Sequence, residues 1–223
     1  MSFDKFKALE IKNKVEKLGG HLVAVSKKFK IEVIKQAAAA GIEDFGENYV
    51  EEALEKIASY SSSHTKNENP VRWHFIGNVQ SNNINKMIDK FDVVHSLFKL
   101  KHIKKFNENS STRQKILIQV RHEDDSRENG VFLNDLESLI LKVKPLPMIN
   151  LKGLMFMPPE EFTKEELSQS FKRIKETFDS LSCKDEKNDW DMISMGMSAD
   201  FEIALEMGAT HVRIGTAVFG ART

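Results

Sequence analysis

Residues 22–47, LVAVSKKFKIEVIKQAAAAGIEDFGE, contain a strand, a helix and a second strand in immediate succession. The run LVAVS is short, apolar and partly β-branched, whereas IEVIKQAAAA has its apolar residues at helical spacing. EDFGE is typical of another short strand. A crossover that holds a helix returns the next strand in the same direction, so this unit predicts a parallel pair.

The same alternation continues along the rest of the chain. Six further strands are indicated by WHFIG, VVHS, ILIQV, LKGLMF, DMISM and HVRIG, with helical patterns such as NINKMIDK and FEIALEM between them. Eight parallel strands predict an α/β fold, a single (β/α)8 barrel of the TIM type over residues 1–223. An open doubly wound sheet is the alternative. A helix at about residues 2–19 precedes the first strand and ends at Gly19-Gly20.

Composition narrows the class of ligand. Lys plus Arg and Asp plus Glu each number 33 in 223 residues, so no global charge attracts nucleic acid or anionic lipid. The lone Cys183 excludes an intramolecular disulfide, and no Cys/His spacing suggests a metal site. The first residues lack the apolar run of a signal peptide or membrane span. We expect a soluble, cytoplasmic protein with a small ligand.

The loop after the seventh strand, residues 194–198, is a candidate phosphate site. In (β/α)8 barrels the loops after strands seven and eight often hold phosphate. Gly196 lets the backbone approach an anion, Ser198 offers a hydroxyl, and the helix that follows presents N–H groups. Taken alone, a Gly-x-Ser turn is typical of an ordinary helix entry.

The eighth strand adds a second group of phosphate ligands. Arg213, Gly215 and Thr216 supply a guanidinium, a bare backbone position and a hydroxyl. An arginine in a strand is usually a structural residue in a salt bridge. The joint position of the two loops, at neighbouring strand ends, favours the phosphate site.

Lys27 ends the first strand, whose neighbour in a closed barrel is the eighth. Its amine would then face the mouth of the barrel beside the phosphate site, where apolar walls and a nearby cation suit a Schiff-base lysine. The alternative is a solvated lysine that merely ends a strand, since Lys28 and Lys30 lie beside it.

Several polar residues lie in or just after the apolar strands. Buried polar groups need partners, so each one is explained by an internal hydrogen bond, and together they can line a polar pocket. They are Asn48, His74, His95, Ser96 and Gln119. Trp73 and Phe75 flank His74 and should face away from it, into the packing between strands and helices.

Five segments are similar to the pyridoxal 5′-phosphate (PLP) homeostasis protein family (YggS/PROSC). They are AVSK at 24–27, FGENYVEEALEKI at 45–57, WHFIGNVQSN at 73–82, GLMFMPP at 153–159 and SMGMSADFEIALEMGATHVRIGTAVFGAR at 194–222. The resemblance spans nearly the whole chain. It implies a barrel similar to the N-terminal domain of bacterial alanine racemase (PLP fold type III).

The resemblance also implies a cofactor and its site. PLP would be held as an internal aldimine on Lys27. The other implied cofactor-binding residues are Asn48, His74, Met195, Gly196, Ser198, Arg213, Gly215 and Thr216. The family is implicated in storing, delivering or buffering PLP in vitamin B6 homeostasis, with PLP-dependent enzymes as clients and no catalytic turnover.

Three residues depart from the family pattern. Arg121 stands where an asparagine is usual, and Glu128 and Asn83 stand where lysines are usual. These changes alter the charge near the barrel mouth, so we infer neither the secondary anion sites nor the PLP release behaviour of the family for this chain.

The main alternative is an amino-acid racemase-like PLP enzyme. Two-base racemisation needs acid/base groups on both faces of the substrate carbon. The only tyrosines, Tyr49 and Tyr60, are expected in the helix after the second strand, and the chain ends at Thr223 without the second domain of the racemases. We therefore expect that the protein is not an enzyme and that it is a monomer.

An aldolase that uses Lys152 as its Schiff-base lysine is also disfavoured. Lys152 precedes an apolar strand and should lie at the opposite face of the barrel from the active-site loops.

Overall fold

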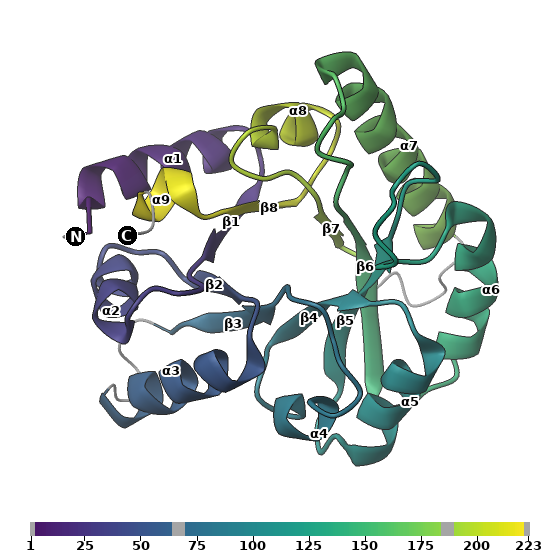
Figure 1. Cartoon of the computed structure of the whole chain (residues 1–223), viewed down its shortest axis with the longest axis horizontal. Helices are drawn as coiled ribbons and strands as arrows, with labels where there is room; N and C mark the ends of the chain where they lie inside the picture. The colour runs from purple at the N-terminus through teal and green to yellow at the C-terminus, as the bar shows by residue number, and fades with distance from the viewer. Residues whose placement is uncertain (1–2, 64–69, 184–189, 221–223) are drawn as a thin grey trace.

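The protein is a closed barrel of eight parallel strands, β1 to β8, in sequence order. The computed structural model describes residues 3–63, 70–183 and 190–220. β8 pairs with β1 through Leu22–Val212 and Ala24–Ile214, which closes the sheet, and helices surround it (Figure 1). The barrel prediction is confirmed, and closure excludes the open doubly wound sheet.

The strands are β1 (His21–Val25), β2 (Asp44–Glu47), β3 (Arg72–Phe75), β4 (Val93–Leu97), β5 (Gln114–Val120), β6 (Ile149–Phe156), β7 (Met192–Ser194) and β8 (His211–Ile214). The helices are α1 (Lys5–Lys17), α2 (Ile31–Ala39), α3 (Val50–Ser63), α4 (Ile84–Met87), α5 (Leu100–Asn109), α6 (Leu133–Val143), α7 (Lys164–Ser182), α8 (Phe201–Glu206) and α9 (Thr216–Phe219). Every strand expected from the sequence is present within two residues of its expected bounds.

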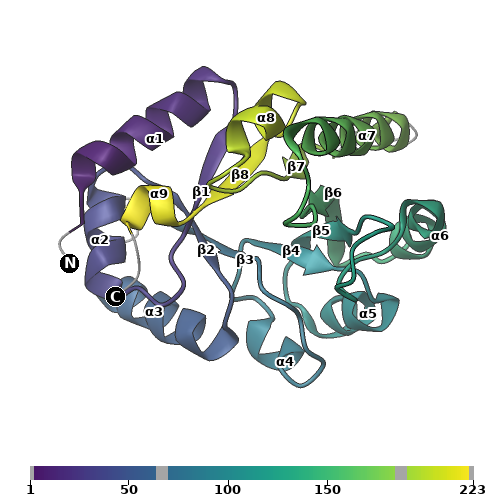
Figure 2. The same ribbon diagram turned by 45° about the horizontal axis from the view of Figure 1, so that its top comes forward.

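The helices differ more from expectation. α1 is shorter than the predicted 2–19, because Asp4 caps it by accepting the Lys7 N–H at 3.1 Å; Ser2 lies outside the described residues. α4 is a single turn rather than 83–90, and Asp89 just beyond it has a positive φ of 56° that no helix accommodates. α9 was not expected; it follows β8 directly and packs beside α1 (Figure 2).

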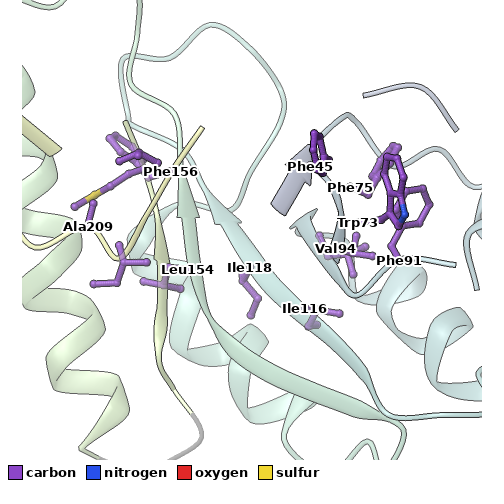
Figure 3. Close-up of a cluster of buried hydrophobic side chains, with 14 of the residues drawn as sticks. Phe45, Trp73, Phe75, Phe91, Val94, Ile116, Ile118, Leu154, Phe156 and Ala209 are labelled. Atoms are coloured by element: carbon purple, nitrogen blue, oxygen red, sulfur yellow. The ribbon is translucent and has the colours of Figure 1, made fainter. Parts of the chain in front are cut away.

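Strand alternation separates an outer apolar layer from a more polar interior. The outward-facing Phe45 and Trp73 rings lie 5.9 Å apart, and those of Phe75 and Phe91 lie 5.3 Å apart (Figure 3). Trp73 and Phe75 are therefore packing residues, as predicted. His74, between them, is buried and faces the barrel interior, where it contacts polar side chains.

Gly153 in β6 is required for close contact with β7. Its φ is +144°, and a Cβ there would lie 2.0 Å from the Met192 carbonyl oxygen. We expect Gly153→Ala to lower the free energy of unfolding by about 2 to 3 kcal/mol, since β6 must move away from β7. Gly41→Ala is the control, because Gly41 has φ +95° but no atom within 4 Å of such a Cβ. It should cost only about 1 kcal/mol. Equal losses in denaturant titrations would contradict the proposed clash.

Candidate functional site

The C-terminal rim of the barrel brings the exits of β1 and β8 together. β1 lies between β8 and β2, with Ala24 paired to Ile214. The chain leaves β1 through Ser26 and the partly buried Lys27, and it leaves β8 through Gly215 and Thr216. The lysine of the AVSK segment and the loop after β8 are therefore neighbours at one edge, as the sequence predicts.

The loops after β7 and β8 are joined by hydrogen bonds. The Arg213 N–H donates to the Gly196 carbonyl at 2.9 Å, and the Thr216 hydroxyl donates to Ser198 Oγ at 3.3 Å. Gly196 has φ +90°, and a Cβ there would lie 2.6 Å from the Ala204 Cβ, so only glycine fits between this loop and α8. Two hydroxyls and a tightly held backbone thus converge. The Met195 side chain is buried in the hydrophobic core, and its backbone N–H donates to the His211 carbonyl at 3.1 Å, so neither is directed to a ligand.

Asp200 adds a carboxylate to the loop after β7. Its Oδ1 accepts the Met197 N–H at 2.5 Å. Burial raises the pKa of Asp200, while the Met197 N–H and the charge of Arg213 oppose that rise. The Asp200 carboxylate therefore stabilises the conformation of this loop, and the Met197 N–H that it accepts is not available to a ligand.

Arg213 is buried beneath the same rim, with 4% of its surface exposed. Nη1 donates to Ser194 Oγ at 2.7 Å and Nη2 donates to the Phe156 carbonyl at 3.0 Å. Burial lowers the pKa of Arg213 to about 10, with Asp200 opposing the change. The guanidinium is still charged at neutral pH, so it places a fixed cation below the loops.

The turn that carries Lys27 is held by a buried group of charges, the Lys56 cluster, which consists of Ser26, Glu47, Glu52 and Lys56. Lys56 Nζ donates to the Ser26 carbonyl at 2.8 Å, to Glu47 Oε1 at 2.7 Å and to Glu52 Oε1 at 2.6 Å. The Ser26 hydroxyl donates to Glu47 at 2.6 Å, and Glu52 also accepts the Lys28 N–H at 2.5 Å. The cluster therefore fixes the backbone on both sides of Lys27.

Glu47 is the fully buried carboxylate of the Lys56 cluster, with its side chain 0% exposed. Burial raises the pKa of Glu47, and the charge and hydrogen bond of Lys56 and the Ser26 hydroxyl oppose this. The sequence alone did not predict this cluster. The spacing of Glu52 and Lys56 by four residues on α3 indicates an ion pair between them. No feature of the sequence indicates that this pair contacts the turn after β1.

Asn48 follows β2 at the same rim. Its Oδ1 is buried and has no hydrogen-bond partner among the described residues. Gly77 passes so close that a Cβ there would lie 2.1 Å from the Asn48 carbonyl oxygen, which explains the glycine of WHFIG. An unsatisfied buried acceptor at a barrel mouth is suited to a ligand that donates a hydrogen bond.

His74 lies deeper than the rim, and the protein itself engages both of its ring nitrogens. Nε2 is 2.8 Å from Asp44 Oδ1, and Nδ1 is 2.8 Å from His95 Nε2. The other strand residues singled out have protein partners too: Gln119 donates to the Asn129 carbonyl at 3.2 Å, and Ser96 donates to the Gly77 carbonyl. These contacts match the internal hydrogen bonds expected of polar residues in strands.

The residues that depart from the family pattern have structural roles or lie at the surface. Arg121 stacks on Phe132, with its guanidinium carbon 4.0 Å from the ring centroid, and Nη1 donates to the Arg127 carbonyl at 2.9 Å. Glu128 is exposed, and Asn83 is the residue before the single turn of α4.

The residues proposed for the alternative enzymes are not gathered at the rim. Lys152 pairs with Asp191, which precedes β7, at 2.8 Å and so lies toward the opposite end of the barrel. Tyr60 is buried against Trp73, at 6.2 Å between ring centroids. The expectation for Tyr49 was wrong: it lies just before α3, because the chain is still turning out of β2 there, and it is half exposed.

Two further kinds of feature are absent from the part of the chain that the structure describes. No helix in residues 3–63, 70–183 and 190–220 is long and apolar enough to cross a membrane. In the same part of the chain, no group of three or more His, Cys, Asp or Glu side chains is arranged to hold a metal ion.

Comparison with known proteins agrees with this geometry. Residues 7–223 match the family described as alanine racemase, N-terminal domain. The pyridoxal phosphate homeostasis protein of Pseudomonas aeruginosa is 38% identical over 204 residues, covering 90% of this chain and 84% of the relative. That of Escherichia coli K12 is 35% identical over 211 residues, covering 90% and 85%.

Solved structures show the same architecture. PipY of Synechococcus elongatus PCC7942, solved with PLP bound, is 28% identical with a TM-score of 0.87, covering 97% of this chain and 99% of PipY. Alanine racemase of Corynebacterium glutamicum has a TM-score of 0.76 at 15% identity, and the match covers 99% of this chain but 63% of the racemase, so it shows a shared fold alone. The chain therefore carries the alanine racemase N-terminal domain and belongs to the pyridoxal phosphate homeostasis protein family.

Proposed function

We propose that this protein binds PLP at the C-terminal rim of the barrel and acts in intracellular PLP homeostasis, without catalytic turnover of its own. The observation that carries the proposal is the meeting of the exits of β1, β7 and β8 at one rim. A lysine, two hydroxyls and a buried guanidinium there match the aldehyde, the phosphate and the aromatic ring of one small molecule. The relatives named for PLP homeostasis and the PLP-bound PipY support the same assignment.

The residues at the rim fit this cofactor. The hydroxyls of Ser198 and Thr216 and the backbone at Gly196 and Gly215 would hold the phosphate, and Met195 would anchor the start of this loop. In α9 the N–H groups of Val218 and Phe219 donate to the Gly215 carbonyl, so the helix N–H groups that we propose for the phosphate are those of Thr216 and Ala217. Asn48, with its unsatisfied Oδ1, would contact the ring or its substituents.

The remaining assigned residues act through charge and position. Arg213 supplies positive charge under the phosphate and pyridine end. His74 lies deeper in the barrel than Arg213 and would act on the cofactor site through its hydrogen bond to His95. Lys27 would bond to the aldehyde carbon of PLP with loss of water. Bound PLP is an electron sink for amino-acid chemistry, and the protein decides whether a substrate reaches it.

The partners we propose are PLP itself and PLP-dependent enzymes that receive it. A monomer in the cytoplasm is the form we propose for this role. Sedimentation of the PLP-loaded protein tests whether it is a monomer. Delivery is tested by mixing the PLP-loaded protein directly with a PLP-dependent apo-enzyme and measuring the rate at which PLP is transferred. A stable dimer, or transfer no faster than PLP dissociation into buffer, would contradict the respective statement.

Absorbance spectroscopy tests the function. Purified protein should show a near-visible band that disappears on borohydride reduction, with the cofactor then fixed as added mass. Stripped protein should recover the band when PLP is titrated back. Racemase and decarboxylase assays with a panel of amino acids should show no turnover. A colourless protein that takes up no PLP refutes the proposal, whereas sustained turnover would favour the racemase-like enzyme.

A further inference from the structure

A continuous chain of buried side chains crosses the barrel interior from the rim to the start of β2. We call it the interior chain; its members are Arg213, Ser194, His95, His74 and Asp44. The links are Arg213 Nη1 to Ser194 Oγ at 2.7 Å, Ser194 Oγ to His95 Nδ1 at 2.9 Å, His95 Nε2 to His74 Nδ1 at 2.8 Å, and His74 Nε2 to Asp44 Oδ1 at 2.8 Å. All five residues are buried.

The donors and acceptors of this chain can be arranged in one direction. Arginine only donates, so Ser194 Oγ accepts from Arg213, and its own O–H can then be directed to His95 Nδ1. His95 Nδ1 is then an acceptor, and in the neutral ring the hydrogen lies on Nε2 and is donated to His74 Nδ1. His74 in turn carries its hydrogen on Nε2 and donates it to the Asp44 carboxylate.

The electrostatics favour an ionised carboxylate at Asp44 and a neutral ring at His95. Arg72 contacts both Asp44 oxygens at 2.6 Å. Burial favours protonation of Asp44, but the hydrogen bonds of Arg72 and His74 outweigh it and lower the pKa of Asp44 below its ordinary range. Burial lowers the pKa of His95 well below its ordinary value, which favours the neutral ring.

We propose that Ser194, His95, His74 and Asp44 are positioning residues that act on the PLP site through Arg213. The interior chain joins the Arg213 cation to the Asp44 carboxylate through polarised neutral groups, and such chains strengthen cooperatively in a buried setting. It holds one amino group of Arg213, while the Phe156 carbonyl holds the other. The guanidinium is thereby presented to the rim in one orientation. This inference rests on the proposed PLP function only where it concerns cofactor affinity.

Nitrogen NMR of the histidine rings tests the direction of the chain without any cofactor. Long-range 1H–15N spectra of PLP-free protein should show His74 and His95 as neutral rings protonated on Nε2, with assignments from His74→Gln and His95→Gln. A charged ring, or an Nδ1–H ring at either position, would overturn the arrangement.

The affinity for PLP tests the action through Arg213. Ser194→Ala removes the first link and should raise the Kd for PLP roughly tenfold, because a buried charged donor loses its partner. Ser194→Thr keeps the hydroxyl and should stay within about twofold of the parent. Ser170→Ala is the matched control, since Ser170 is a buried serine on α7 outside the interior chain. Unchanged affinity in Ser194→Ala, or equal weakening in Ser194→Thr, contradicts the proposal.

A double variant separates a connected chain from independent core contacts. Asp44→Asn, at the far end, should also weaken PLP binding, by roughly threefold to tenfold. Ser194→Ala/Asp44→Asn should bind no more weakly than the weaker single variant, because the first break already isolates Arg213. Fold-changes that multiply would refute the coupling. If the parent binds no PLP, the proposed function fails while the ring spectra still decide the interior chain.

Discussion

Lys27→Ala is expected to abolish covalent PLP binding. The variant should lack the near-visible band that borohydride removes, and reduction should add no cofactor mass to it. The reason is chemical: only a neutral primary amine attacks the PLP aldehyde, and Lys27 leaves β1 beside the loop of Gly215 and Thr216. Intact mass spectrometry after reduction, on parent and variant side by side, measures the difference directly.

Two controls make the Lys27 result specific. Lys30→Ala removes an exposed lysine three residues away and should leave the fixed mass unchanged. Lys27→Arg retains a cation without a nucleophilic amine, so it should bind PLP without fixing it. Covalent PLP at parental level in Lys27→Ala would place the reactive amine elsewhere.

The largest loss of stability is expected from Lys56→Met. Lys56 is 7% exposed and lies 2.7 Å from Glu47, whose side chain is 0% exposed. Removing one partner leaves the other as an uncompensated buried charge, which costs about 3 to 5 kcal/mol. The turn of Ser26 also loses its hydrogen bond to Nζ. Urea titration of the PLP-free protein measures the change in the free energy of unfolding.

The pH dependence identifies Glu47 as the cause. Its pKa is already raised by burial, and loss of Lys56 removes the main opposing influence. A carboxyl whose folded pKa exceeds its unfolded value binds more protons in the native state, so stability falls as pH rises through the window above 4.5. The cost of Lys56→Met should therefore be smaller near about pH 5 than near about pH 8.

Lys86→Met is the matched control for Lys56→Met. Lys86 lies 2.8 Å from Glu51, but the two side chains are 53% and 61% exposed. Its loss should change the free energy of unfolding by no more than about 0.5 kcal/mol at either pH. Similar losses of unfolding free energy in the two variants would show that the buried charge of Glu47 does not cause the destabilisation. A loss in Lys56→Met that does not depend on pH would show the same.

The fold was predictable because its signals are local. Each strand is a short apolar run, each helix has its own periodicity, and parallel pairing follows from the crossovers. The misjudged elements are those with weak local signals: α4 is cut short before Asp89, and α9 is four residues that follow a glycine. Single turns carry too few residues for a periodic pattern to show.

The site was predictable in part. Its loops could be located because closure of the barrel places the exits of β1 and β8 side by side. The partners of buried polar groups could not, because they depend on register between strands. Nothing near His95 in the sequence indicates that Ser194 will lie 2.9 Å away, and nothing near Lys56 indicates the Ser26 carbonyl.

Pairing of β1 with β8 also determines when, during translation, the proposed cofactor site can form. Lys27 is synthesised before Arg213, Gly215 and Thr216, because it precedes them in the chain. A nascent chain therefore exposes the lysine long before the opposing loops exist. The proposed cofactor site is therefore complete only after translation has delivered the eighth strand.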